Sequence, residues 1–138
     1  MTTDSVDTEK SRYDVASGIL DEIFGPEWRD KTKVTGVKAV DDFQRITVEH
    51  CYADAWARDA LDFKTRSVIS LTTVATMGAL DEVKLHVEAA LANGHSMEDI
   101  FEILLHLIPY IGVPKAVHAL RAAGDAFQEI FSRGSEQS

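Results

Sequence analysis

The amino-acid sequence predicts an all-α protein, a single-domain helical bundle of about six helices. Apolar side chains recur three or four residues apart through most of the chain, which is the spacing of one helix face. Residues that begin and end helices stand at the borders of these periodic segments. The run Thr72-Thr73-Val74 has strand propensity, but no turn signal or partner strand surrounds it.

Length and composition agree with one domain. The chain has 138 residues, of which 45% are hydrophobic and 27% charged. A chain of this size can bury a core without disulfides or metals. We therefore expect one domain over 1–138, with flexible polar ends at about 1–8 and 134–138.

The first half of the chain contains two predicted helices. The first ends at a Gly-Pro pair at positions 25 and 26. A connector with little periodicity follows over 27–40. Asp41 or Asp42 can then cap the second helix, which continues towards Trp56.

Three further helices follow in close succession. Asp62 is a plausible N-cap for the third, which ends near Gly78. The fourth covers about 81–92 and stops at Asn93-Gly94, a pair that favours a left-handed C-terminal turn. The fifth begins with the capping pattern Ser-x-x-Asp at positions 96 to 99.

Pro109 lies inside the predicted fifth helix, where it removes a hydrogen bond to the carbonyl of Leu105 and should kink or end the helix. We interpret it first as a helix terminator, although a kink that shapes a pocket is the alternative. Pro114 then suits the first turn of the sixth helix, which runs to about Phe131.

Charge and motifs exclude several classes of function. Fourteen basic and 23 acidic residues give a net charge of −9, which disfavours binding to nucleic acid or anionic lipid. The chain has no apolar run of membrane-spanning length and no signal peptide, so we expect a cytoplasmic protein. Phosphate-binding glycine loops, serine-hydrolase motifs and metal-binding histidine motifs are all missing, and we expect no metal.

His86 is the first candidate for catalysis, because Glu82 lies one helical turn before it. Residues four apart share a helix face, so the carboxylate can orient the imidazole and raise its basicity. The alternative is a surface pair that contributes a few tenths of a kcal/mol to stability.

The other histidines and the cysteine have plainer interpretations. His106 interrupts an apolar face, and we expect a core residue whose nitrogens are satisfied by hydrogen bonds. His95 and His118 are expected to face solvent. His50 is no natural dyad with the adjacent Glu, and Cys51 is expected to be a buried, inert thiol.

Arg58 and Arg66 flank the start of the third helix, where acidic residues are normally favoured. A guanidinium beside free helical N–H groups could hold a carboxylate. A weak salt bridge from Arg66 to Asp62 is an equally good interpretation.

From about 48 to 124 the chain resembles the carboxymuconolactone decarboxylase family, an all-α family related to the alkylhydroperoxidase D proteins. The resemblance rests on an ordered set of residues in one register: Trp56-Ala57-Arg58, Leu61-Asp62, Lys64-Thr65-Arg66-Ser67, Glu82, His86, Ala89-Ala90-Leu91, Asn93-Gly94, Glu98, Ile100, Glu102, Leu104-Leu105-His106, Tyr110, Gly112-Val113-Pro114, Ala119 and Arg121.

The resemblance implies a carboxy-lyase that needs no cofactor. The family's reaction converts γ-carboxymuconolactone to β-ketoadipate enol-lactone and CO2 in protocatechuate catabolism, the β-ketoadipate pathway of aromatic degradation. Because electrons left by CO2 delocalise to the lactone carbonyl, the substrate supplies its own electron sink. The protein then has to stabilise an enolate and protonate carbon.

The same resemblance implies roles for particular side chains. We expect His86, oriented by Glu82, to be the general acid, and Arg66 to hold a substrate carboxylate with Arg58 as second choice. Three further residues are expected to contact the substrate: His106, Tyr110 and Trp56.

Alternatives to this function stay open. They are a family member with another small-carboxylate substrate, a thiol-dependent peroxidase-like antioxidant, and a non-catalytic protein that binds small molecules. The peroxidase relatives carry two cysteines where this chain has Ala79 and Glu82, so a disulfide relay is not expected. The resemblance also implies a homo-oligomer, a hexamer built as a trimer of dimers.

Overall fold

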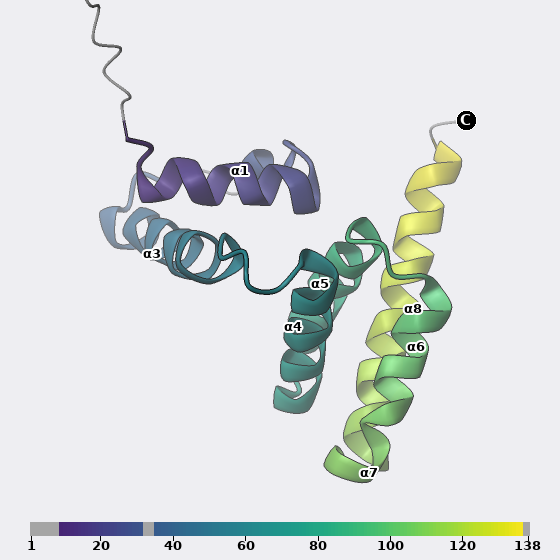
Figure 1. The fold of residues 1–138 in the computed structure, drawn as a ribbon. Coiled ribbons are helices and arrows are strands. Elements are labelled where there is room, and N and C mark those ends of the chain that lie inside the picture. Colours follow the sequence, from purple (N-terminus) through teal and green to yellow (C-terminus); the bar gives the residue numbers. More distant parts are fainter. Residues whose placement is uncertain (1–8, 32–34, 137–138) are drawn as a thin grey trace, which may run out of the picture. The chain divides into compact units, whose positions relative to one another are not determined.

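A computed structural model of the chain describes residues 9–31 and 35–136, and in this part every regular element is a helix (Figure 1). The predicted all-α fold class is confirmed. The chain forms two compact units, the first up to Ala60 and the second from Leu61, and each is described by itself. The single domain expected over 1–138 stays a prediction.

The first unit is built around its N-terminal helix. Its elements are α1 (Arg12–Phe24), α2 (Trp28–Lys31), α3 (Lys38–Val48) and the π-helix η1 (Glu49–Trp56). Helix α1 packs against both η1 and α3. The unit buries mainly apolar side chains, namely Ala16, Leu20, Ile23, Trp28 and Trp56.

The start of α3 differs from the prediction. Its N-cap is Val37, so neither Asp41 nor Asp42 caps the helix. The carboxylate of Asp41 instead accepts hydrogen bonds from the backbone N–H of Thr35 at 2.9 Å and from its hydroxyl at 3.1 Å. Asp41 thus closes the turn that precedes the helix, from a position inside its first turn.

The predicted second helix does continue to Trp56, but its last part has π-helical geometry. The N–H of Ala57 donates to the carbonyl of Tyr52 at 2.9 Å, a bond that spans five residues. Arg12 on α1 holds this segment from the side, because its guanidinium donates to Asp54 at 3.1 Å and to Glu49 at 3.3 Å.

The second unit contains the remaining helices. They are α4 (Phe63–Met77), α5 (Leu80–Ala92), α6 (Met97–His106), α7 (Ile108–Ile111) and α8 (Val113–Glu136). Helix α5 packs against α4 and α8, and α6 lies beside α8 (Figure 1). Large side chains from α4, α5 and α6 meet small ones from α8 in one core: Leu71, Val83, Val87, Ile100, Leu104, Ala119, Ala122, Ala123 and Ala126.

Most helix ends of the second unit follow the sequence signals. Asp62 caps α4, Gly78 ends it with φ of 69°, and Ser96 and Asp99 form a reciprocal capping box on α6. Because α6 ends at His106 and Pro109 lies in the first turn of α7, the terminator interpretation is confirmed.

The two ends of the chain differ from each other. Helix α8 extends beyond the expected end near Phe131, so residues 134–136 are helical. The predicted flexible residues 1–8, together with 137–138, lie outside the described residues. Over the described part of the chain, none of the helices combines the length and apolar character that crossing a membrane requires.

Candidate functional site

His86 lies on α5 at the edge of the helix face that enters the core. Its neighbours Val83 and Val87 are fully buried, whereas the imidazole is half-buried. The Nδ1 atom is buried and has no hydrogen-bond partner among the described residues. A buried polar atom without a partner is uncommon and costs free energy, so it is a candidate for functional contact.

Two opposing effects set the pKa of His86. Burial lowers the pKa below its ordinary value of 6.5, because it disfavours the charged imidazolium. The charge of Glu82, an exposed residue one turn away, acts in the opposite direction and is smaller. The net pKa is lowered, so the expected gain in basicity from Glu82 is outweighed by desolvation.

Arg66 lies in the first turns of α4 and is half-buried. Its Nε donates to the carbonyl oxygen of Leu61 at 3.2 Å, which directs the side chain back towards the residues before the helix. The N-cap Asp62 accepts from the N–H of Thr65 at 2.7 Å. Hydrogen bonds from the side chain and the backbone of Thr65 lower the pKa of the Asp62 carboxyl. The helix start that carries Arg66 is therefore well ordered.

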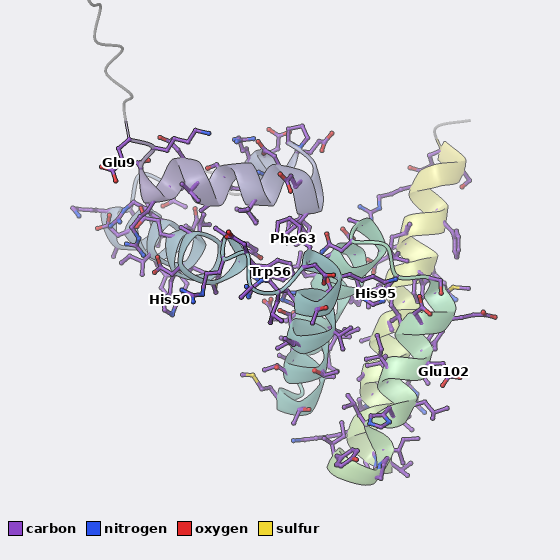
Figure 2. All side chains as sticks on the ribbon, in the orientation of Figure 1. Glu9, His50, Trp56, Phe63, His95 and Glu102 are labelled. Atoms are coloured by element: carbon purple, nitrogen blue, oxygen red, sulfur yellow. The ribbon has the colours of Figure 1, made fainter. Side chains whose placement is uncertain are left out.

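The turn between α5 and α6 contacts this same helix start. Asn93 Nδ2 donates to the hydroxyl of Ser67 at 2.7 Å, and Ser67 is fully buried. His95 lies on this turn (Figure 2), and its Nε2 is 2.8 Å from the carbonyl oxygen of Lys64. Only 9% of the His95 side chain is exposed, so the expectation that His95 faces solvent is wrong. His118 is exposed, as expected.

The expectation that His106 belongs to the core is also wrong, because its side chain is exposed. The buried face of α6 is formed by Ile100 and Leu104. A residue two positions after Leu104 lies about 200° further round the helix, on the opposite side. The His106 ring instead stands 5.5 Å from the ring of Tyr110, itself 74% exposed.

Trp56 and Arg58 belong to the first unit, whereas Arg66 and His86 belong to the second. Trp56 lies at the end of η1 (Figure 2) and is buried. Its ring centroid is 6.1 Å from that of Tyr52. Arg58 is exposed. Of these two first-unit residues, Trp56 is thus a core residue, whereas Arg58 has an exposed side chain.

His50 and Cys51 are the other candidate residues of the first unit. His50 is exposed, and its Nδ1 lies 3.6 Å from Asp54 one turn later, so its acidic neighbour is Asp54 and not the adjacent Glu49. Cys51 is half-buried, where a fully buried thiol was expected. Among the described residues, no group of three or more His, Cys, Asp or Glu side chains could hold a metal ion.

An open hollow of about 350 Å³ lies beside the start of α4. It is lined by Lys64, Thr65, Val68, Ile69 and His95. Lys64 contributes to the lowered pKa of both Asp62 and Asp99, so its positive charge faces two carboxylates.

Sequence reasoning missed Asn93 and His95 as partners of α4. The Asn-Gly turn and the Ser capping pattern predicted where α5 ends and α6 begins, and both were correct. Nothing in a local pattern indicates that this turn folds onto a carbonyl 31 residues earlier. The available signal for this contact was that Asn93 and Lys64 both belong to the residues on which the family resemblance rests.

Comparisons with known proteins place this arrangement in a family. The chain is 24% identical over 122 residues to the 4-carboxymuconolactone decarboxylase of Acinetobacter baylyi, covering 88% of this chain and 91% of that protein. It is 24% identical over 136 residues to the nitrosuccinic acid decarboxylase of Metarhizium robertsii, covering 97% and 95%. An uncharacterized 15.0 kDa protein of Paracoccus denitrificans is 30% identical over 94 residues, covering 67% of this chain and 70% of that protein.

The match to a family model covers the last part of the first unit and most of the second. It extends over residues 41–125, from α3 through most of α8, and includes Arg66 and His86. Since more than half of the chain is matched in one segment, the resemblance noted in the sequence is confirmed. The chain belongs to the carboxymuconolactone decarboxylase family.

Proposed function

We propose that this protein is a decarboxylase that acts, without a cofactor, on a small carboxylated substrate which supplies its own electron sink. Family membership supports the proposal, as do two relatives named as decarboxylases that align over most of their length. We expect the enzyme to work in the cytoplasm on an intermediate of aromatic catabolism, with γ-carboxymuconolactone as the first candidate substrate.

The names of the two relatives point to a common chemistry. Loss of CO2 from a carboxymuconolactone leaves electrons that delocalise to the lactone carbonyl. In nitrosuccinic acid a nitro group stands next to one carboxylate, so the same electrons are stabilised as a nitronate. Each substrate also keeps a second carboxylate after CO2 has left. The proposed substrate class is therefore a dicarboxylate with an electron-accepting group placed to delocalise the carbanion that the departing carboxylate leaves behind.

His86 is the proposed proton donor, and the observation that carries this role is its buried, unpartnered Nδ1. This atom has a hydrogen bond left to make, and because it is buried the imidazole would have to rotate, or its neighbours shift, for a substrate to reach it. The lowered pKa makes the imidazolium a stronger acid, which favours transfer of its proton to a carbanion-like carbon. Glu82 would then stabilise the charged imidazolium through its own negative charge.

Arg66 is the proposed binder of the carboxylate that remains, since a guanidinium can hold a carboxylate through two parallel hydrogen bonds. Arg58, which is exposed, is the second choice for this role. His106 and Tyr110 would contact substrate as a pair of neighbouring rings, one of them donating to the enolate oxygen. Trp56, the last of the expected contacts, is a core residue of the first unit.

The proposal is tested by measuring CO2 release from a panel of acids. γ-Carboxymuconolactone and nitrosuccinic acid contain an electron sink, whereas succinic acid has none and serves as the substrate control. We expect CO2 from at least one of the first two and none from succinic acid. The variant His118→Gln, at an exposed histidine of α8, should retain wild-type activity. Absence of CO2 from both activated acids would contradict the proposal.

A further inference from the structure

The turn between α5 and α6, residues 93–95, makes two side-chain contacts with the start of α4. Asn93 donates to the fully buried hydroxyl of Ser67 at 2.7 Å. His95 lies with Nε2 at 2.8 Å from the carbonyl oxygen of Lys64. Both contacts join residues far apart in the chain, separated by 26 and 31 positions. The two contacts join the α5–α6 turn to the first turns of α4.

The contact with a carbonyl oxygen determines which ring nitrogen of His95 acts as the donor. A carbonyl oxygen can only accept, so Nε2 must carry the hydrogen that is donated to Lys64. The Nδ1 atom then faces Asp99, whose carboxylate lies 4.0 Å away and also accepts from the N–H of Ser96 at 2.8 Å. His95 is thus held between the start of α4 and the capping box of α6.

The two contacts stand on either side of Arg66 in the sequence. Lys64 comes two residues before Arg66, and Ser67 comes directly after it. The bonds therefore limit both the rotation and the translation of the helical turn from which the guanidinium projects. Bidentate binding of a carboxylate depends on such fixed geometry, because small displacements weaken the interaction steeply.

Helix α4 has separate means of forming and ending. Asp62 caps its first turn, and Gly78 terminates it in the left-handed conformation. The bonds from Asn93 and His95 are therefore not needed to start the helix. What they add is the placement of its first turn relative to α5 and α6.

We propose that Asn93 and His95 are positioning residues, which hold the first turn of α4 so that Arg66 meets the substrate carboxylate. This inference rests on the proposed function, since it takes Arg66 as the carboxylate binder. It assigns a role to two residues outside the candidate catalytic set. Each acts through the backbone or the side chain of α4, and neither is required to touch substrate.

The first test measures KM and kcat for CO2 release in His95→Ala, Asn93→Ala and His95→Gln. Loss of either bond should raise KM about five- to thirtyfold with kcat nearly unchanged, because carboxylate binding is weakened equally in ground and transition states. His95→Gln retains an N–H donor and should restore much of the wild-type KM. His118→Ala, at an exposed histidine of the same unit, is the matched control.

A purely structural role predicts a different result. Destabilised variants would contain less folded enzyme, so apparent kcat would fall while KM stayed constant. The second test is a double-mutant cycle with Arg66→Gln. In that background His95→Ala should produce no further rise in KM, because the group that it positions has been removed. An undiminished effect in the Arg66→Gln background would overturn the proposal.

A binding measurement separates this inference from the proposed function. Succinate is a dicarboxylate that cannot react, and its Kd by calorimetry should follow the same pattern across the variants. If the pattern holds in Kd while no acid is decarboxylated, the positioning role stands and the proposed function fails. Wild-type values of Kd and KM in both alanine variants would overturn the positioning role alone. A wild-type protein that binds no carboxylate would overturn both.

Discussion

His86 is the residue at which burial and charge act in opposite directions. The sequence placed Glu82 one turn away, and its charge does favour the imidazolium. Burial has the larger effect, and it depends on how α5 packs against α4 and α8. Spacing along one helix could therefore predict the Glu82–His86 pair. The direction of the pKa shift could be determined only from the burial of His86 in the folded second unit.

The lowered pKa of His86 has a consequence for stability. The unfolded chain, with a His pKa near 6.5, binds more protons than the folded chain at pH values between the lowered pKa and 6.5. The free energy of unfolding should therefore decrease as the pH falls through 6.5. His86→Gln should lack this component of the pH dependence. Urea unfolding at about pH 7.5 and about pH 5.5 measures it.

The control for this experiment is His118→Gln, which changes an exposed histidine. It should follow the wild-type dependence on pH. If His86→Gln lost as much stability on acidification as the wild type, the buried environment of the imidazole would be contradicted.

At the scale of whole helices, the sequence predicted those helix ends that are capped by residues within three or four positions. It did not predict the start of α3, where the hydrogen bonds join residues further apart. Asp62, Gly78 and the Ser96–Asp99 box act within a few residues of themselves, and each was identified correctly. The start of α3 was misassigned because Asp41 bonds to Thr35, six residues earlier. The π-helical geometry of η1 was not predicted from the spacing of its apolar side chains.

The cap of α4 provides a direct test of its local design. Asp62→Ala removes the acceptor for the N–H of Thr65 and should lower the free energy of unfolding by about 0.5–2 kcal/mol. Asp62→Ser keeps a side-chain oxygen and should retain most of the stability. Chemical denaturation of the three proteins makes the comparison. Equal stability of wild type and Asp62→Ala would show that the cap contributes nothing.

Two adjacent leucines on α6 test which face of the helix enters the core. Leu104 is 1% exposed and packs in the cluster shared with α8, whereas Leu105 is 55% exposed. Leu104→Ala should cost about 2–5 kcal/mol through lost burial and a cavity. Leu105→Ala should cost roughly 0.5 kcal/mol or less, as is typical of surface changes. Thermal or urea unfolding that reversed this order would mean that α6 is rotated.

At the scale of the whole molecule, the chain exposes many large apolar side chains. Helix α3 has no buried residue, and its aromatic side chain Phe43 is 72% exposed. In the second unit, Tyr110 and Phe131 are 74% and 64% exposed. Apolar side chains left in contact with water favour association. Sequence patterns could predict that these helices are amphipathic, but not which apolar faces a single chain leaves uncovered.

We propose that these surfaces are covered by further copies of the chain, in a homo-oligomer that is a hexamer built as a trimer of dimers. Analytical ultracentrifugation at micromolar concentration should then give a mass several times the 15.2 kDa of one chain. Phe43→Glu, which puts a charge on the exposed apolar side of α3, should shift the distribution towards smaller species. A wild-type monomer under these conditions would exclude the assembly.

Proton transfer by His86 links the fold to the proposed decarboxylation, and turnover of His86→Gln tests it most directly. The glutamine retains polarity and approximate size but cannot deliver a proton as an imidazolium does. With γ-carboxymuconolactone as substrate, kcat for CO2 release should fall by roughly two to four orders of magnitude relative to the wild type. Equal kcat values for His86→Gln and wild type would show that the buried imidazole takes no part in the reaction.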